Sequence, residues 1–250
     1  MSSQAPSQVG VQHRELAAML QTLPRSKLRE EFVYADEFVV CENFCPTPLL
    51  LTLQSQLSSL SGSVHRNFIV RHKKGGSISR FELDTTAPIF ASIYQDPILK
   101  NFLSELAAVP LLESPTTDPH AYALYYYTEP GDHIGYHYDT SYYRGSRYTM
   151  LLGLVDNSDC VLEYQLHRRN PNRETETHAL PLSPGTMVFF NGDKLYHRIT
   201  PLRGKGSRIA LTFEYLTDSR ISRSGRFVSN MKDAIAYFGL RQVFQRRPRQ

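Results

Sequence analysis

Short segments with the composition of β-strands fill the second half of this chain, and they limit its possible folds more than any other feature. From about residue 121 onward, runs rich in β-branched and aromatic residues alternate with turns rich in Gly, Asn, Asp and Pro. We expect strands at Tyr122–Thr128, Tyr148–Val155, Cys160–Leu166, Thr186–Asn191, Leu195–Thr200 and Arg208–Leu216. Many short strands are typical of a sandwich or a barrel, the jelly roll included. No repeat of fixed period occurs, which disfavours propellers and solenoids.

The first half of the chain has the periodicity of helices. Apolar residues spaced three and four apart predict helices at Val11–Leu23, Pro46–Leu60 and Asp96–Ala107. Strand-like runs lie between them at Phe38–Glu42, Asn67–Arg71 and Ser79–Leu83. We expect the basic stretch from His72 to Gly76 to be a flexible, solvated connection, although the Arg71–Lys74 cluster could meet an anionic group.

The composition fits a single domain over residues 1–250. A hydrophobic fraction of 41%, with 15 Tyr and 13 Phe, can build a core without disulfides. The three cysteines, Cys41, Cys45 and Cys160, form neither a disulfide framework nor a zinc pattern, so we expect free thiols in a reducing compartment. The polar residues 1–10 are expected to be disordered and lack the apolar run of a signal peptide. Apolar runs such as Leu49–Leu53 are too short to cross a bilayer, so we expect a soluble, cytoplasmic protein.

Within this domain, we expect a helix-rich support over residues 11–120, a β core over 121–217 and a basic helical extension over 219–250. The extension contains seven Arg, one Lys and one Asp, a net charge of +7, whereas the whole chain carries +4. Its apolar residues follow the spacing of a buried helical stripe: Phe227, Val228, Met231, Ile235 and Phe238. A packed C-terminal helix with solvated arginines is therefore expected, and nucleic acid is not the expected partner.

An H-x-D triplet follows the turn at Pro130 and Gly131. On an extended backbone, residues two apart point to the same face, so His137 and Asp139 can reach one metal ion. His197, in the run GTMVFFNGDKLYHRITPL, is the best candidate for a third ligand. Two histidines and one carboxylate leave the opposite face of the metal open, as in non-heme Fe(II) oxygenases.

The order of these residues, followed by Arg208, resembles the Fe(II)- and 2-oxoglutarate-dependent oxygenase superfamily. The motif of that superfamily is H-x-D…H…R/K on a double-stranded β-helix, and the sixty-residue gap from His137 to His197 lies within its usual range. The resemblance covers residues 121–217 well and the rest loosely. It implies a mainly β fold with flanking α: a double-stranded β-helix (jelly roll) with N-terminal supporting helices and a C-terminal helix.

The resemblance also implies the site residues and the cofactors. His137, Asp139 and His197 would bind Fe(II), and 2-oxoglutarate and O2 would take the other positions. Arg208 would hold the far carboxylate of 2-oxoglutarate through its planar fork. By analogy with the prolyl hydroxylases of the superfamily, Tyr127 and Thr149 would line the co-substrate pocket. Tyr125 or Tyr126 would replace Tyr127 if the register slips by one.

Substrate contacts are expected from the segment that follows the metal triplet and from the strand before His197. The candidates are Tyr138, Ser141, Tyr142, Arg144 and Asn191. Aromatic side chains beside a cation could hold a small polar substrate at the mouth of the pocket.

The sequence departs from several branches of the superfamily. Halogenating relatives replace the metal-binding carboxylate with Gly or Ala, whereas Asp139 is present here. Nucleic-acid dealkylases carry a second Arg six residues after the first, and Glu214 stands at that position. Collagen-type prolyl hydroxylases use Lys in place of Arg208, and the isopenicillin N synthase group has Ser in place of Ala210.

We therefore expect an oxygenase that oxidises an unactivated C–H bond of a small metabolite, such as an amino acid or a derivative. The alternatives are an oxygenase that uses the basic tail to act on a protein or a nucleic acid, and a non-catalytic jelly-roll binding module.

Overall fold

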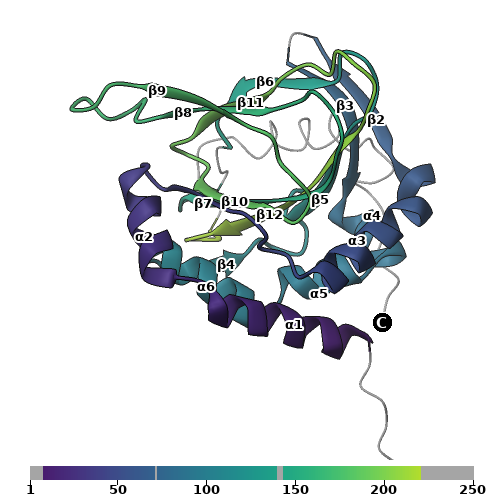
Figure 1. The fold of residues 1–250 in the computed structure, drawn as a ribbon, viewed down its shortest axis with the longest axis horizontal. Coiled ribbons are helices and arrows are strands. Elements are labelled where there is room, and N and C mark those ends of the chain that lie inside the picture. The colour runs from purple at the N-terminus through teal and green to yellow at the C-terminus, as the bar shows by residue number, and fades with distance from the viewer. Residues whose placement is uncertain (1–7, 71, 140–142, 221–250) are drawn as a thin grey trace, which may run out of the picture.

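The strands form one antiparallel sheet that curls back on itself, with helices against one side of it (Figure 1). The computed structural model describes residues 8–70, 72–139 and 143–220. Its strands are β1 (Phe38–Cys41), β2 (His65–Ile69), β3 (Lys73–Ser79), β4 (Leu112–Glu113), β5 (Tyr122–Tyr127), β6 (His133–His137), β7 (Arg147–Asp156), β8 (Leu162–Leu166), β9 (Glu176–Leu180), β10 (Met187–Asn191), β11 (Tyr196–Ile199) and β12 (Arg208–Leu216). The spatial order is β1-β10-β7-β12-β5-β3-β6-β11-β8-β9, while β2 pairs with β3 and β4 pairs with β12.

This order creates two facing half-sheets. Strands β1, β10, β7, β12 and β5 form the half beside the helices, and β6, β11, β8 and β9 form the opposite half (Figure 1). Strand β3 joins them, because it pairs with both β5 and β6. The mainly β jelly-roll fold with supporting helices is therefore confirmed. The expected C-terminal helix lies outside the described residues.

The helices come from the first half of the chain and cover the outer face of the first half-sheet (Figure 1). They are α1 (Gln8–Thr22), α2 (Arg25–Tyr34), α3 (Thr47–Leu60), α4 (Arg80–Thr86), α5 (Ile89–Tyr94) and α6 (Pro97–Ala107), with a 3-10 turn at Ser61–Ser63. Helix α6 illustrates their local origin. Asp96 caps it by accepting hydrogen bonds from the backbone N–H groups of Ile98 and Leu99, at 2.8 and 3.0 Å, and proline occupies its first position.

The buried apolar side chains divide into two cores. The larger one lies between the helices and the first half-sheet and includes Phe32, Leu53, Phe102 and Phe189. The smaller one contains side chains of both half-sheets, including Leu162, Ile199 and Ala210. The helices thus stabilise one side of the sheet and leave the space between the half-sheets for a site. Cys41, Cys45 and Cys160 are buried free thiols, as expected.

Three sequence-based expectations for the first half are wrong. Residues 8–10, expected to be disordered, belong to α1. The segment from Lys73 to Gly76, expected to be a flexible loop, is part of β3 at the centre of the sheet. Residues 80–83, expected to continue a strand, begin helix α4.

A close approach of neighbouring strands explains the glycines of β3. A Cβ atom on Gly76 would meet Val64 Cγ1 at 2.5 Å and Tyr126 Cβ at 3.1 Å. The absence of a side chain therefore permits the packing of this central strand, and here glycine marks close packing of the strands instead of flexibility.

Among the described residues, no helix is both long and apolar enough to cross a bilayer.

Candidate metal centre and its cavity

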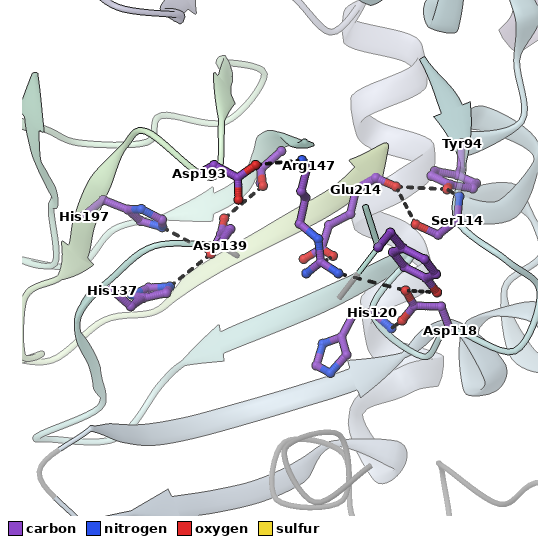
Figure 2. Close-up of polar contacts among 12 residues, drawn as sticks. Tyr94, Ser114, Asp118, His120, His137, Asp139, Arg147, Asp193, His197 and Glu214 are labelled. Carbon is purple, nitrogen blue, oxygen red and sulfur yellow. Dashed lines mark hydrogen bonds and ion pairs between the residues drawn. The ribbon is translucent and has the colours of Figure 1, made fainter. Parts of the chain in front are cut away.

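The three predicted metal ligands converge on one point. His137 ends β6, Asp139 follows two residues later, and His197 lies on β11 directly opposite His137. One ligand atom from each residue lies within 4.8 Å of the other two. Asp139 Oδ1 is 3.2 Å from His137 Nε2 and 3.8 Å from His197 Nε2, and Figure 2 shows both rings pointing at this carboxylate.

Backbone hydrogen bonds fix the orientation of both imidazoles. His137 Nδ1 lies 2.8 Å from the carbonyl oxygen of Gly135, and His197 Nδ1 lies 3.2 Å from that of Leu195. A neutral imidazole that donates from Nδ1 has its lone pair on Nε2, the atom that faces Asp139 in both cases. This arrangement is typical of metal-binding histidines, whose second nitrogen is held by a hydrogen bond.

Asp139 is held in its ionised form. Burial alone would raise the pKa of its carboxyl group, but His197, His137 and the Thr149 hydroxyl lower that pKa well below the usual range. Burial also lowers the pKa of His197 to about 4, which keeps the imidazole neutral at pH 7. Ionised carboxylate and neutral imidazole are the forms that bind a divalent metal. The donor set and its protonation therefore fit Fe(II).

A glycine packed against Asp139 allows this residue to take its position. A Cβ atom on Gly192 would lie 2.7 Å from the carbonyl oxygen of Asp139 and 2.8 Å from its Cβ. The turn between β10 and β11 therefore packs directly against the metal triplet.

The metal centre opens into a cavity of about 360 Å³ between the two half-sheets. Arg208 lies at one side of this cavity and is 1% exposed. Its nearest carboxylate is Asp156, with Nη1 to Oδ2 at 3.5 Å, and its Nε has no hydrogen-bond partner in the described part of the chain. A buried guanidinium with an unused donor fits the far carboxylate of 2-oxoglutarate.

Tyr127 lines the same side of the cavity, because it pairs with Arg208 across β5 and β12. Tyr125 also lines the cavity, whereas Tyr126 belongs to the core beneath the helices. Two of the three tyrosines that the sequence left open thus face the site. Burial raises the pKa of Tyr127, so its hydroxyl is a neutral hydrogen-bond donor.

Thr149 contacts the metal triplet. Its hydroxyl donates to Asp139 Oδ2 at 2.9 Å, and it is fully buried. Thr149 therefore lies next to the candidate metal-binding carboxylate, whereas the sequence pattern suggested contact with the co-substrate.

The predicted substrate residues occupy different environments. Tyr138 lines the cavity, and Arg169 lies over its ring at 4.0 Å from the centroid. Asn191 is buried, and its amide donates to Glu37 at 2.8 Å. The backbone N–H of Arg144 donates to the carbonyl of Arg220, and its side chain is exposed. Ser141 and Tyr142 lie outside the described residues.

A polar cluster that the sequence did not indicate lines another wall of the cavity. Arg147, on β7, lies 2.7 Å from Glu214 and 4.0 Å from Asp118, and His120 is adjacent (Figure 2). Burial raises the pKa of Glu214 to about 8 and lowers that of His120 to about 4. The only sequence signal was Glu214 itself, an acid where nucleic-acid dealkylases have arginine.

Known structures share this fold. No family model matches the chain, and no curated protein matches it in sequence. The structure is similar to the alpha ketoglutarate-dependent epimerase SnoN from nogalamycin biosynthesis (TM-score 0.63, 12% identity, 77% of this chain and 80% of that one). It is also similar to the carbocyclase SnoK of the same biosynthesis (TM-score 0.63, 13% identity, 84% and 92%). A prolyl hydroxylase from Trichoplax adhaerens, in complex with a peptide of the hypoxia-inducible factor, has a TM-score of 0.59 at 14% identity (86% and 94%). The chain therefore has the fold of the Fe(II)- and 2-oxoglutarate-dependent oxygenases.

Proposed function

We propose that this protein is an Fe(II)- and 2-oxoglutarate-dependent oxygenase that oxidises an unactivated C–H bond of a small metabolite. One observation carries the proposal: a two-histidine, one-carboxylate centre opens into the same cavity as a buried arginine with an unused donor. When bound, iron, 2-oxoglutarate and O2 would supply the oxidising chemistry, with release of succinate and CO2.

The residues of the chain would position and shield the reactants. His137, Asp139 and His197 would hold the metal from one side and leave the cavity side for the co-substrate and O2. Arg208 would bind the far carboxylate of 2-oxoglutarate, assisted by the hydroxyl of Tyr127. The apolar side chains of Leu151, Leu162 and Ile199 line the cavity and would exclude water from the reacting carbon.

Several observations favour a small substrate. The cavity volume of about 360 Å³ must hold the co-substrate and the substrate together, so it limits the substrate to a small molecule or one side chain. SnoN and SnoK are described as proteins of nogalamycin biosynthesis, that is, of a small molecule. An amino acid or a derivative is the substrate class that we propose. Hydroxylation is the simplest outcome, and desaturation or oxidative cyclisation would use the same site.

A second candidate is an oxygenase that acts on a side chain of a protein. The Trichoplax prolyl hydroxylase, which has the same fold, was solved with a peptide. In this chain Phe68 and Val70 are about 70% exposed on either side of Ile69, which lines the cavity. Such apolar side chains at the cavity edge could contact a peptide. A comparison of succinate release with free amino acids, short peptides and single-stranded oligonucleotides separates these substrate classes.

The central test replaces one metal ligand. We expect His137→Ala to lose bound Fe(II) and 2-oxoglutarate-dependent succinate formation, because two ligands hold the metal far more weakly than three. The matched control is His133→Ala, on the same strand and outside the cavity, which should retain both properties. Iron content after anaerobic reconstitution and succinate release are the measurements. Unchanged succinate release in His137→Ala would refute the proposed function.

A further inference from the structure

The inward face of β12 carries polar groups in addition to Arg208, the residue proposed to bind the co-substrate. Arg208, Ala210, Thr212 and Glu214 alternate along the strand and all line the cavity. At roughly 3.3 Å per residue, Glu214 lies on the order of 20 Å along the strand from Arg208. A co-substrate anchored on Arg208 therefore leaves the other end of this row for another molecule.

Two side chains at that end have unused hydrogen-bonding capacity. The Thr212 hydroxyl is buried and has no hydrogen-bond partner within the described ranges. Glu214 is 6% exposed, and its Oε2 lies 2.7 Å from Arg147 without a hydrogen bond. Buried polar groups normally find partners. The unbonded Thr212 hydroxyl, on the same cavity wall as a Glu214 carboxylate whose partner among the described residues is Arg147, therefore indicates a missing ligand.

The charges of this wall favour a cation. Arg147 is the cation of the cluster, and both Glu214 and Asp118 lie within 4.0 Å of it. His120 adds no charge at neutral pH, because burial lowers its pKa to about 4. The four side chains therefore carry one more negative than positive charge when both acids are ionised. Burial raises the pKa of Glu214 to about 8, and a cation bound beside its carboxyl group would lower that pKa and favour the ionised form.

Burial disfavours the positive charge of a further basic residue in this region, Lys73. Lys73 approaches from β3, with Nζ 4.4 Å from the centroid of the Tyr125 ring. It is 1% exposed, and burial lowers its pKa well below the ordinary value, which favours the neutral amine.

The cluster is also close to the metal. Glu214 pairs with Thr149 across β12 and β7, and Thr149 donates to the metal-binding carboxylate of Asp139. Neighbouring strands lie about 4.8 Å apart, so a molecule of amino-acid size can contact Glu214 and still place a carbon beside the metal.

Given the proposed function, we infer that Glu214 and Thr212 bind a protonated primary amine of the substrate. An ammonium group has three N–H donors and no acceptor, which matches the unbonded Thr212 hydroxyl and the acceptor positions of the Glu214 carboxylate that its ion pair with Arg147 leaves open. Arg147, whose Nη1 lies 2.7 Å from Oε2, would orient the Glu214 carboxylate. The substrate class is therefore a small molecule with a free amino group, and an N-acylated or purely anionic molecule would not fit.

The first experiment uses the full-length wild-type protein, reconstituted anaerobically with Fe(II) and 2-oxoglutarate. The probes are the twenty free amino acids and simple diamines, each compared with its N-acetylated form. We expect at least one amine to bind and to stimulate succinate release, and its N-acetyl form to do so at least tenfold less. Equal stimulation by the amine and its N-acetyl form would overturn the inference. It would also be overturned if no amine bound to protein that contains iron and slowly converts 2-oxoglutarate to succinate. Protein without iron and without any succinate formation would instead refute the proposed function.

The second experiment compares variants with the best amine from the panel. Glu214→Gln keeps the shape of the side chain and should raise the KM for the amine roughly 10- to 100-fold, because hydrogen bonds to charged groups contribute most. Glu214→Asp should retain part of the affinity, and Thr212→Val should raise this KM several-fold. Arg208→Gln should instead raise the KM for 2-oxoglutarate. A purely structural role of Glu214 predicts a lower melting temperature with no selective change in the KM for the amine.

Discussion

At the scale of single residues, Thr149 determines the orientation of the Asp139 carboxylate, the proposed metal ligand. Its hydroxyl donates to Asp139 Oδ2, which leaves Oδ1 as the atom that faces both imidazoles. Residues that hold a metal ligand in this way tune its orientation and its affinity for the metal. The register of β7 places Thr149 here, because the neighbouring Tyr148 points to the helix side, where it stacks on Phe32 and Phe189.

Replacing Thr149 distinguishes this role from contact with the co-substrate. We expect Thr149→Val to weaken Fe(II) binding by at least about tenfold, with Thr149→Ser close to the wild type. Anaerobic metal titration measures this effect. A loss of 2-oxoglutarate affinity at saturating Fe(II), with unchanged metal affinity, would contradict it and support the co-substrate contact that the sequence pattern predicted.

At the scale of secondary-structure elements, one ion pair joins the β2–β3 hairpin to the start of β6. Arg66 donates to both oxygens of Asp132, at 2.9 and 2.6 Å. The same carboxylate, which is fully buried, accepts hydrogen bonds from the backbone N–H groups of Thr128 and Glu129. This contact holds the hairpin against the strand that carries His137.

Removing the charge of Asp132 should destabilise the fold in a pH-dependent way. Burial raises the pKa of Asp132, but Arg66 and the two backbone groups outweigh it, so the net pKa in the folded state lies below the ordinary 3.8. A carboxyl group whose pKa is depressed by folding stabilises the fold fully above its ordinary pKa, and this contribution is lost as the pH falls through the lower, folded-state value.

We therefore expect Asp132→Asn to lower the free energy of unfolding by about 3 kcal/mol at pH 7, the lower end for a buried pair, because the Arg66 side chain is 33% exposed. The difference from the wild type should stay constant down to about pH 5 and shrink below about pH 4. Urea denaturation at several pH values measures both. A difference that grows in acid would contradict this assignment.

The elements that the sequence predicted are those whose pattern is local. The strands from Tyr122 onward are confirmed to within a few residues, since alternation and turn residues are read directly from the sequence. Strand β3 was mistaken for a loop, because its two lysines and two glycines have low strand propensity. Its position also depends on pairing with β5, a strand distant in the sequence that a local pattern does not reveal.

The same distinction holds for the candidate site. His137 and Asp139 are two residues apart, so their common orientation follows from an extended backbone, and their convergence with His197 agrees with the structure. The contact between Arg147 and Glu214 depends on the register of β7 against β12. No spacing in the sequence encodes that register, and for this reason the polar cluster was not predicted.

At the scale of the whole molecule, the helices stabilise the half-sheet from which Thr149 and Glu214 project. Phe32 of α2 is fully buried, and its ring stacks on Phe189 and Tyr148 with centroids 5.4 and 6.5 Å apart. These contacts lie on the face of the sheet opposite the cavity. The stabilising aromatic contacts and the candidate site therefore lie on opposite faces of the same sheet.

This separation predicts a variant that loses stability but keeps its metal site. We expect Phe32→Ala to lower the free energy of unfolding by about 3–5 kcal/mol, the usual cost of removing a buried aromatic ring. Its affinity for Fe(II) below the melting transition should equal that of the wild type. Val33→Ala, at a neighbouring position that is 56% exposed, is the control and should change stability by no more than about 0.5 kcal/mol. A large loss of Fe(II) affinity in Phe32→Ala would show that the two faces of the sheet are coupled.

The backbone carbonyls of Gly135 and Leu195 hold both imidazoles in an orientation that suits metal binding. A site with two nitrogen ligands and one oxygen ligand is poorly selective among first-row divalent metals. Such sites bind Ni²⁺ and Cu²⁺ more tightly than Fe²⁺. The identity of the bound metal would then depend on cellular supply, and aerobically purified protein would carry inhibitory substitutes. Chelation and reloading under anaerobic conditions should consequently precede every assay of this protein.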